Sequence, residues 1–120
     1  MPTVLVVEDE GISRRALVSL LAASGYKAIA FGSAEEALQE AEERSIPRLA
    51  LVDVDLPGMN GLDLIARLSQ LRPDLYAVLI TAVEGDRIKR FRATHTVGYL
   101  RKPLDVSRLL ELLTNSQPSA

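Results

Sequence analysis

Five short runs of apolar residues recur along the chain, and a segment with helical spacing follows each of them. The runs cover residues 4–7, 27–31, 49–52, 77–80 and 97–100. Apart from the weaker second run they are apolar without alternation, which is typical of strands buried on both faces of a sheet. This alternation of strand and helix, repeated five times, predicts one parallel sheet with helices on both faces.

The intervening segments carry start and stop signals for helices. Gly25 stands where a C-terminal cap belongs, and Ser33 with Glu36 has the spacing of a capping box. Pro73 ends the third helical pattern, and Asp105 can cap the last one. The apolar faces of these four helices comprise residues 12, 16, 17, 20 and 21; 37, 38 and 41; 62, 65, 68 and 71; and 106, 109, 110 and 113.

The helix between the fourth and fifth strands has the weakest pattern. Ile88 and Phe91 are its large apolar residues, and residues 94–96 are poor helix formers. We expect this helix to be short or mobile.

Composition narrows the chemistry that such a domain can carry. The chain has 120 residues, of which 48% are hydrophobic, and this suits one domain with a real core. It has no cysteine and one histidine, His95, so thiolate and multi-histidine metal sites are excluded. The longest apolar stretch, residues 16–23, is too short to span a bilayer. With no basic residue before Arg14 to start a secretory signal, we expect a cytoplasmic protein that does not contact a membrane.

The net charge of −2 hides an asymmetry between the two halves of the chain. Residues 1–63 carry 11 acidic and five basic side chains, whereas residues 64–120 carry five acidic and nine basic ones. Much of the positive charge falls in residues 84–102. This segment is either a solvated helix face or a surface for an acidic partner. Direct nucleic-acid binding is not expected, because no recognition-helix module is left over.

Polar side chains follow the apolar runs at the carboxyl ends of four strands, where open parallel sheets bind their ligands. Glu8 and Asp9 follow the first run, Asp53 the third, Thr81 the fourth and Lys102 the fifth. Clustered carboxylates repel one another, and Mg²⁺ with its preference for oxygen ligands relieves that repulsion. One carboxylate can then act as a nucleophile toward phosphorus, with Lys102 and Thr81 contacting the phosphoryl group.

Each of these residues has an ordinary structural explanation when taken alone. An acidic pair after an apolar run is often a turn, and so is Lys102-Pro103. Thr81 can simply bond to backbone at a strand end. Asp53 is harder to explain in this way, because an unpaired carboxylate at the end of a buried strand is costly. The joint occurrence at successive strand ends supports the functional interpretation.

The sequence resembles the receiver domain of two-component response regulators over about residues 3–114. Four segments carry the resemblance, in order and with matching spacing: Val6-Val7-Glu8-Asp9-Glu10, the run from Leu51 to Gly61, Ile80-Thr81-Ala82, and Gly98-Tyr99-Leu100-Arg101-Lys102-Pro103. The resemblance implies a flavodoxin-like doubly wound α/β fold with five parallel strands in the order 2-1-3-4-5 and five helices. Residues 1–114 form the receiver domain in this interpretation, and residues 115–120 form a tail or the start of a linker.

The resemblance also implies roles for the residues at the strand ends. Asp53 resembles the phosphoacceptor, and Asp9 a direct Mg²⁺ ligand. Glu8 resembles its acidic companion, which acts through water, and the backbone carbonyl of Asp55 resembles a further ligand. Lys102 is expected to contact the phosphoryl group.

Two further residues resemble the moving parts of the family's switch. Thr81 resembles the switch hydroxyl and Tyr99 the switch aromatic. The bond between Lys102 and Pro103 is expected to be cis.

The implied function is a phosphoacceptor switch in a two-component phosphorelay. A sensor histidine kinase or histidine phosphotransfer protein donates the phosphoryl group to Asp53, with Mg²⁺ as cofactor or Mn²⁺ as its substitute. The face formed by the fourth helix, fifth strand and fifth helix then changes shape for a downstream protein or a fused output domain. Such a domain assists its own phosphorylation and dephosphorylation but is not an enzyme in the ordinary sense.

Some features depart from the commonest pattern of the family. Glu8 stands where Asp is more usual. Asp55 adds an acidic side chain beside the site, and as a hypothesis it slows the approach of anionic phosphodonors or alters how fast the phosphoryl group is lost. The basic, polar fourth helix leaves open whether the family's common dimer contacts apply.

The site is also compatible with two other interpretations. Asp53-Val54-Asp55 has the Asp-x-Asp pattern of haloacid-dehalogenase-type phosphatases, which also use Mg²⁺. Pro57 and the early position of Glu8 and Asp9 disfavour that family. A docking module that does not take phosphate is the other alternative.

Overall fold

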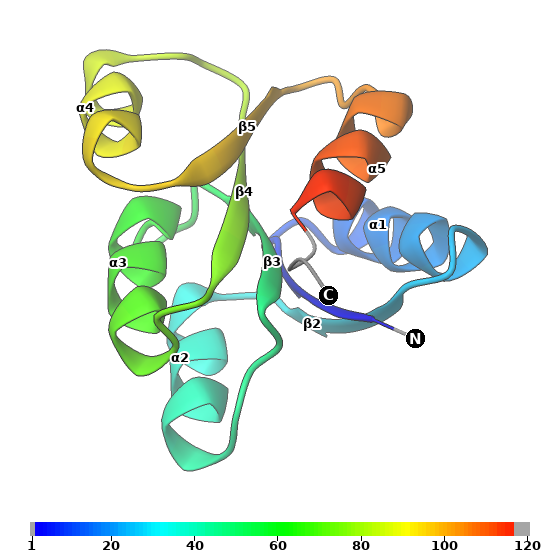
Figure 1. Cartoon of the computed structure of the whole chain (residues 1–120), viewed down its shortest axis with the longest axis horizontal. Coiled ribbons are helices and arrows are strands. Elements are labelled where there is room, and N and C mark those ends of the chain that lie inside the picture. Colours follow the sequence, from blue (N-terminus) through cyan, green and yellow to red (C-terminus); the bar gives the residue numbers. More distant parts are fainter. Residues whose placement is uncertain (1, 117–120) are drawn as a thin grey trace.

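The computed structural model describes residues 2–116 as one five-stranded parallel sheet with helices between the strands (Figure 1). The strands are β1 (Thr3–Val7), β2 (Lys27–Phe31), β3 (Leu49–Asp53), β4 (Tyr76–Thr81) and β5 (Val97–Arg101). The helices are α1 (Gly11–Ala23), α2 (Ala34–Glu43), α3 (Gly61–Leu71), α4 (Asp86–Thr94) and α5 (Val106–Asn115). The strand order β2-β1-β3-β4-β5 confirms the predicted fold class.

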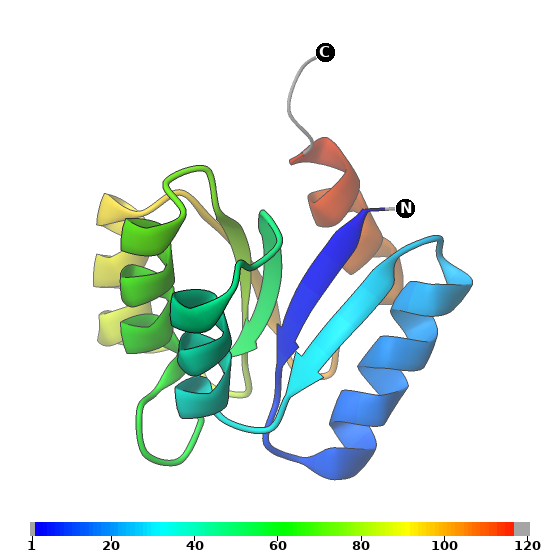
Figure 2. The same cartoon turned by 90° about the horizontal axis from the view of Figure 1, so that it is seen from below.

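The sheet separates two apolar cores, one on each face. Helices α1 and α5 cover one face, and α2, α3 and α4 cover the other (Figures 1 and 2). Alternate residues of β1 face opposite cores: Leu5 and Val7 face the α2–α4 side, whereas Val4 and Val6 face the α1–α5 side. This double burial is the reason why the strand sequences are apolar without alternation.

Capping residues lie at the helix boundaries that the sequence predicts. Gly25 follows α1 with a φ of 90°, a conformation that glycine adopts at little cost. The Ser33 hydroxyl accepts a hydrogen bond from the Glu36 N–H at 3.2 Å, and the Asp105 carboxylate accepts one from the Arg108 N–H at 3.2 Å.

Helix α4 is the shortest helix among the described residues, with nine residues, as expected from its weak apolar pattern. Its N-cap is Gly85, which provides no side-chain hydrogen bond, and Ile88 is its one buried residue. The Phe91 ring is half-buried and stacks on the His95 ring with centroids 4.0 Å apart. The expected mobility of this helix stays a prediction.

The end of the chain bears on the expected domain boundary. Helix α5 runs to Asn115, which is the first residue of the expected tail, and residues 117–120 lie outside the described part of the chain. Within residues 2–116, none of the helices has the length and apolar character needed to cross a membrane.

Candidate functional site

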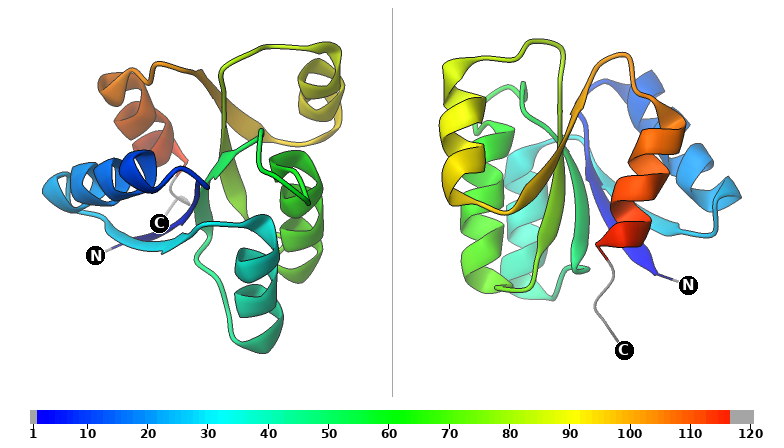
Figure 3. Two further views of the ribbon diagram at one scale, coloured as in Figure 1. Left: turned by 180° about the vertical axis from the view of Figure 1, so that it is seen from behind. Right: turned by 45° about the horizontal axis from the view of Figure 1, so that its top comes forward.

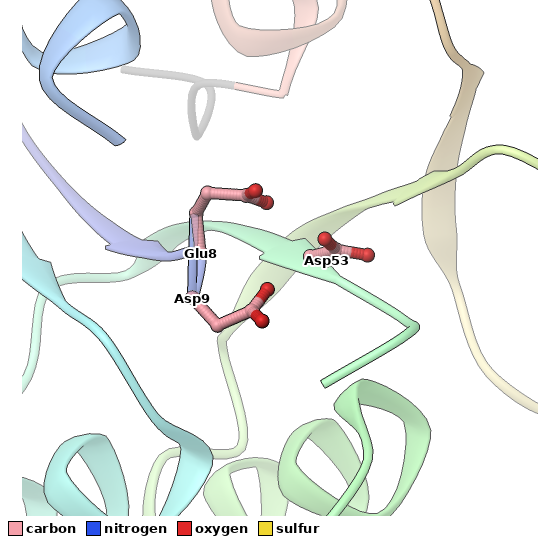
Figure 4. A group of neighbouring side chains, drawn as sticks. All are labelled: Glu8, Asp9 and Asp53. Carbon is pink, nitrogen blue, oxygen red and sulfur yellow. The ribbon is translucent and has the colours of Figure 1, made fainter. Parts of the chain in front are cut away.

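Three carboxylates meet at the carboxyl ends of the neighbouring strands β1 and β3 (Figure 4). The two strands are paired so that Val7 lies opposite Val52, and Glu8 therefore emerges beside Asp53. One oxygen each of Glu8, Asp9 and Asp53 lies within 4.8 Å of the other two. In the left panel of Figure 3, which shows the molecule from behind, the loops that follow β1 and β3 lie near each other in the middle of the view.

Asp53, the last residue of β3, is almost completely enclosed. The residue is only 3% exposed, and each of its carboxylate oxygens has a donor. Oδ1 accepts the Asp55 N–H at 2.9 Å, and Oδ2 lies 3.1 Å from Lys102 Nζ. The buried charge is thus stabilised by an ammonium group and a backbone amide, in the way that buried carboxylates require.

Glu8 is also buried, with 2% of its surface exposed, but it is less well paired. Its Oε2 atom lies 3.8 Å from Lys102 Nζ and has no hydrogen-bond partner among the described residues. Burial, together with the hydrogen bond and negative charge of Asp53, raises the pKa of Glu8 to about 7. A further cation beside Glu8 would stabilise the ionised form of its carboxylate, which burial and Asp53 disfavour.

Lys102 supplies the positive charge of the site. It follows β5, its N–H donates to the Thr81 carbonyl at 2.8 Å, and its bond to Pro103 is cis, as expected. Burial lowers the pKa of Lys102, but the carboxylates of Asp53 and Glu8 outweigh this effect and raise its pKa above the ordinary value. Lys102 is accordingly a permanent cation between two acids.

Thr81 lies at the end of β4 and is fully buried. Its hydroxyl contacts the Asp55 carboxylate at 3.0 Å and the Val83 carbonyl at 3.0 Å. The Asp55 side chain itself is exposed and is not one of the three clustered acids. The structure therefore brings together Glu8, Asp9, Asp53 and Lys102, and it places Thr81 beside the group with its hydroxyl bonded elsewhere.

Comparison with known proteins decides what kind of module carries this arrangement. The family model described as "Response regulator receiver domain" matches residues 4–114. The chain belongs to the response regulator receiver domains. This membership favours the receiver interpretation of the acidic site over the phosphatase interpretation.

Relatives of the receiver domain include both short and long proteins. The chain is 35% identical over 115 residues to the polar-differentiation response regulator DivK of Brucella ovis, and it covers 92% of that protein. It is 30% identical to a cyclic di-GMP phosphodiesterase of Thermotoga maritima, of which it spans 30%, and 32% identical to the transcriptional regulatory protein PdtaR of Mycobacterium tuberculosis, of which it spans 52%.

Solved structures agree with this fold. A CheY-like receiver domain from Methanospirillum hungatei superposes with a TM-score of 0.88 at 26% identity, covering 96% of this chain and 92% of the other. A receiver protein from Pseudomonas putida superposes with a TM-score of 0.85 at 29% identity, covering 95% of this chain and 96% of the other.

The receiver domain's Tyr99 lies apart from the acids, on β5. Its ring is half-buried against the core on the α2–α4 face, and the Arg92 guanidinium of α4 lies 4.8 Å from the ring centroid. The Tyr99 hydroxyl is buried without a hydrogen-bond partner among the described residues. Rotation of Tyr99 would therefore break a cation–π contact with α4.

Two residues that hold the loop between β1 and α1, which contains Glu8 and Asp9, were not predicted from the sequence. The Glu10 carboxylate caps α1 by accepting the N–H groups of Ile12 and Ser13 at 3.1 and 2.7 Å. Arg14 donates to the Glu8 carbonyl at 2.9 Å and to the Asp9 carbonyl at 3.3 Å. Glu is not among the residue types that mark an N-cap, and the signal in the sequence is only the negative charge of Glu10 just before a helical pattern. No sequence signal reveals the Arg14 contacts, because they depend on how α1 packs.

Proposed function

We propose that this receiver domain is a Mg²⁺-dependent phosphoacceptor switch in which Asp53 receives a phosphoryl group from a phosphohistidine of a partner protein. One observation carries the proposal: Asp53 is a buried carboxylate that lies 3.1 Å from a lysine ammonium and within 4.8 Å of two further acids. The partner is a sensor histidine kinase or a histidine phosphotransfer protein.

The donor set at the site fits a small divalent cation. It consists of carboxylate oxygens, which Mg²⁺ and Mn²⁺ both accept, and it includes the unpartnered Oε2 atom of Glu8. Asp9, Asp53 and the backbone carbonyl of Asp55 would hold the ion directly, and Glu8 would do so through water. When bound, the ion neutralises charge on the carboxylates and on the phosphoryl oxygens.

The transfer itself requires little from the protein beyond position and charge. A carboxylate oxygen of Asp53 forms a bond to phosphorus while the P–N bond to the donor imidazole breaks, and the electron pair of that bond stays on the imidazole nitrogen. Lys102 keeps its positive charge beside Asp53 throughout and stabilises the charge on the phosphoryl oxygens. Loss of the phosphoryl group to water returns Asp53 to its carboxylate form. Receiver domains are therefore signalling modules and not enzymes in the ordinary sense.

The new group changes the charge balance at the strand ends and drives the switch. It adds roughly one negative charge beyond the carboxylate that it modifies, together with strong acceptor oxygens. A shift from mostly inactive to mostly active requires about 5.5 kcal/mol of differential stabilisation, and hydrogen bonds to charged groups contribute about 1.5–3 kcal/mol each. Contacts to Lys102 and Thr81, followed by rotation of Tyr99, would alter the face formed by α4, β5 and α5, where a downstream protein or a fused output domain docks.

The proposal is tested by intact-mass measurement after incubation with acetyl phosphate and Mg²⁺. The wild type is expected to gain one phosphoryl mass, and the gain should disappear in Asp53→Asn and after chelation of the metal. Asp63→Asn is the matched control, because Asp63 is an exposed acid in the first turn of α3 and should leave the gain unchanged.

Two results would contradict the proposal. A phosphoryl gain in Asp53→Asn equal to that of the wild type would place the modification elsewhere. No gain in the wild type, either with acetyl phosphate or with a phosphorylated histidine phosphotransfer protein, would support the docking-module interpretation instead.

A further inference from the structure

The Asp55 carboxylate is engaged with the switch hydroxyl and not with the metal-ligating group. Asp55 Oδ2 lies 3.0 Å from Thr81 Oγ1, whereas the acids whose oxygens cluster within 4.8 Å are Glu8, Asp9 and Asp53. The two partners are 26 positions apart in the sequence and reach each other across the ends of β3 and β4. Thr81 is fully buried and Asp55 is exposed, so the contact lies where the site opens to solvent.

The Thr81 hydroxyl has one proton and two acceptors that compete for it. Asp55 Oδ2 and the Val83 carbonyl oxygen both lie 3.0 Å from Oγ1, and the Val83 N–H donates to Oγ1 at 3.2 Å. A charged carboxylate is a stronger acceptor than a neutral carbonyl. The charge of Asp55 therefore decides where the hydroxyl donates.

Asp53 pairs with Ile80, so Thr81 lies one residue further along the neighbouring strand. In the proposed switch its hydroxyl must donate to the phosphoryl group on Asp53. A single proton cannot serve the phosphoryl group and Asp55 together. Phosphorylation therefore leaves the Asp55 carboxylate without its hydroxyl donor at the moment when a further negative charge appears beside it.

We propose that Asp55 is a positioning residue that acts through Thr81, holding the switch hydroxyl away from Asp53 in the unphosphorylated protein. The inference rests on the proposed function and adds to it a residue that biases the switch toward its inactive arrangement. Breaking the Asp55–Thr81 bond is part of the cost of activation. Removal of the Asp55 carboxylate therefore favours the active arrangement by releasing Thr81.

The test measures binding of beryllofluoride, a phosphoryl mimic, in the presence of Mg²⁺ by isothermal titration calorimetry. Asp55→Ala is compared with its parent in two backgrounds, the wild type and Thr81→Val, which lacks the hydroxyl. Simple repulsion between Asp55 and the anion acts equally in both backgrounds, whereas the release of Thr81 acts only where the hydroxyl is present.

We expect Asp55→Ala to tighten binding about tenfold more in the wild-type background than in the Thr81→Val background, as for one hydrogen bond to a charged group. Asp55→Asn keeps an oxygen acceptor without the charge and should give an intermediate effect. Asp63→Ala, which removes an exposed acid that does not contact Thr81, should leave binding unchanged. Equal tightening in both backgrounds would overturn the proposal and leave repulsion as the whole effect of Asp55.

A second measurement separates this proposal from the proposed function. Thermal unfolding of the wild type, Asp55→Ala, Thr81→Val and the double variant, without metal or anion, reports the Asp55–Thr81 bond alone. The Tm change of the double variant should differ from the sum of the two single changes by about 4 °C. Additive Tm changes would show that Asp55 does not hold the Thr81 hydroxyl, and they would overturn the proposal. Failure of every variant to bind beryllofluoride would refute the proposed function, while the unfolding measurement would still decide whether Thr81 is held.

Discussion

Gly61 controls how closely α3 approaches the proposed phosphoacceptor. A Cβ atom at this position would lie 2.2 Å from the Asp53 carbonyl oxygen and 2.9 Å from the Val54 Cα atom. The Gly61 N–H also donates to the Val54 carbonyl at 3.0 Å. The start of α3 is therefore packed directly on the backbone that holds the Asp53 carboxylate in place.

We predict that Gly61→Ala destabilises the domain by about 1–3 kcal/mol or more, because the backbone of β3 must shift to admit the methyl group. Urea unfolding followed by circular dichroism measures the change. Gly85→Ala is the control, since a Cβ at Gly85 meets nothing within 4 Å, and its cost should stay below about 1 kcal/mol. Equal costs for the two variants would show that the contact at Asp53 is not limiting.

At the scale of the elements, α2 forms a hydrogen bond with the loop of residues 54–60, which follows the proposed phosphoacceptor Asp53. The Glu35 carboxylate, in the first turn of α2, accepts the Met59 N–H at 2.9 Å. The loop passes so close that a Cβ at Gly58, where φ is 73°, would lie 2.8 Å from Glu35 Oε2. The hydrogen bond from Met59 holds the pKa of Glu35 below its ordinary value of 4.5.

A carboxylate whose pKa is lowered by folding stabilises the folded state when it is ionised. For Glu35 this contribution is present above pH 4.5 and is lost as the pH falls through the lower value of the folded state. We predict that Glu35→Gln lowers the Tm by about 2 °C at pH 7, and that the difference from the wild type shrinks toward zero in acid.

Thermal unfolding at pH 7 and at acidic pH checks this prediction, with Glu42→Gln as the control. Glu42 is an exposed acid on the same helix, outside its first turn, and its removal should give no such pH-dependent difference. A Tm difference between Glu35→Gln and the wild type that is unchanged by pH would contradict the assignment.

For the whole molecule, the important feature is that two cores share one sheet. Leu68 of α3 belongs to the core on one face, and Leu109 of α5 belongs to the core on the other. Both side chains are 0% exposed. The strands contribute alternate residues to the two cores, so neither core can persist when the sheet is lost.

We predict that Leu68→Ala and Leu109→Ala each lower the free energy of unfolding by about 2–5 kcal/mol and leave a single transition. Far-UV circular dichroism follows the helices of both faces. Tyrosine emission, recorded in a background that carries Tyr76→Phe and Tyr99→Phe, follows Tyr26, which is buried on the α1–α5 side. The two signals should have the same midpoint in each variant. Separate midpoints would show that the two faces unfold independently.

Much of the fold could be predicted because its signals are local. Residues 49–52 are apolar without interruption and form a strand that is buried on both faces, and Asp105 caps a helix as its position indicates. The predicted order of the strands came from the family resemblance and is confirmed. The gathering of Glu8, Asp9, Asp53 and Lys102 also followed, because parallel strands bring their carboxyl ends to one edge.

The sequence by itself determined which segments form strands and helices and which polar groups follow each strand, since periodicity, caps and strand ends are properties of neighbouring residues. The tertiary structure decided which atoms meet. Lys102 reaches Asp53 across 49 positions, Thr81 reaches Asp55 across 26, and Gly61 packs on the Asp53 carbonyl. These contacts depend on differences of a few tenths of an ångström between packed elements, and local sequence patterns carry no information at that precision.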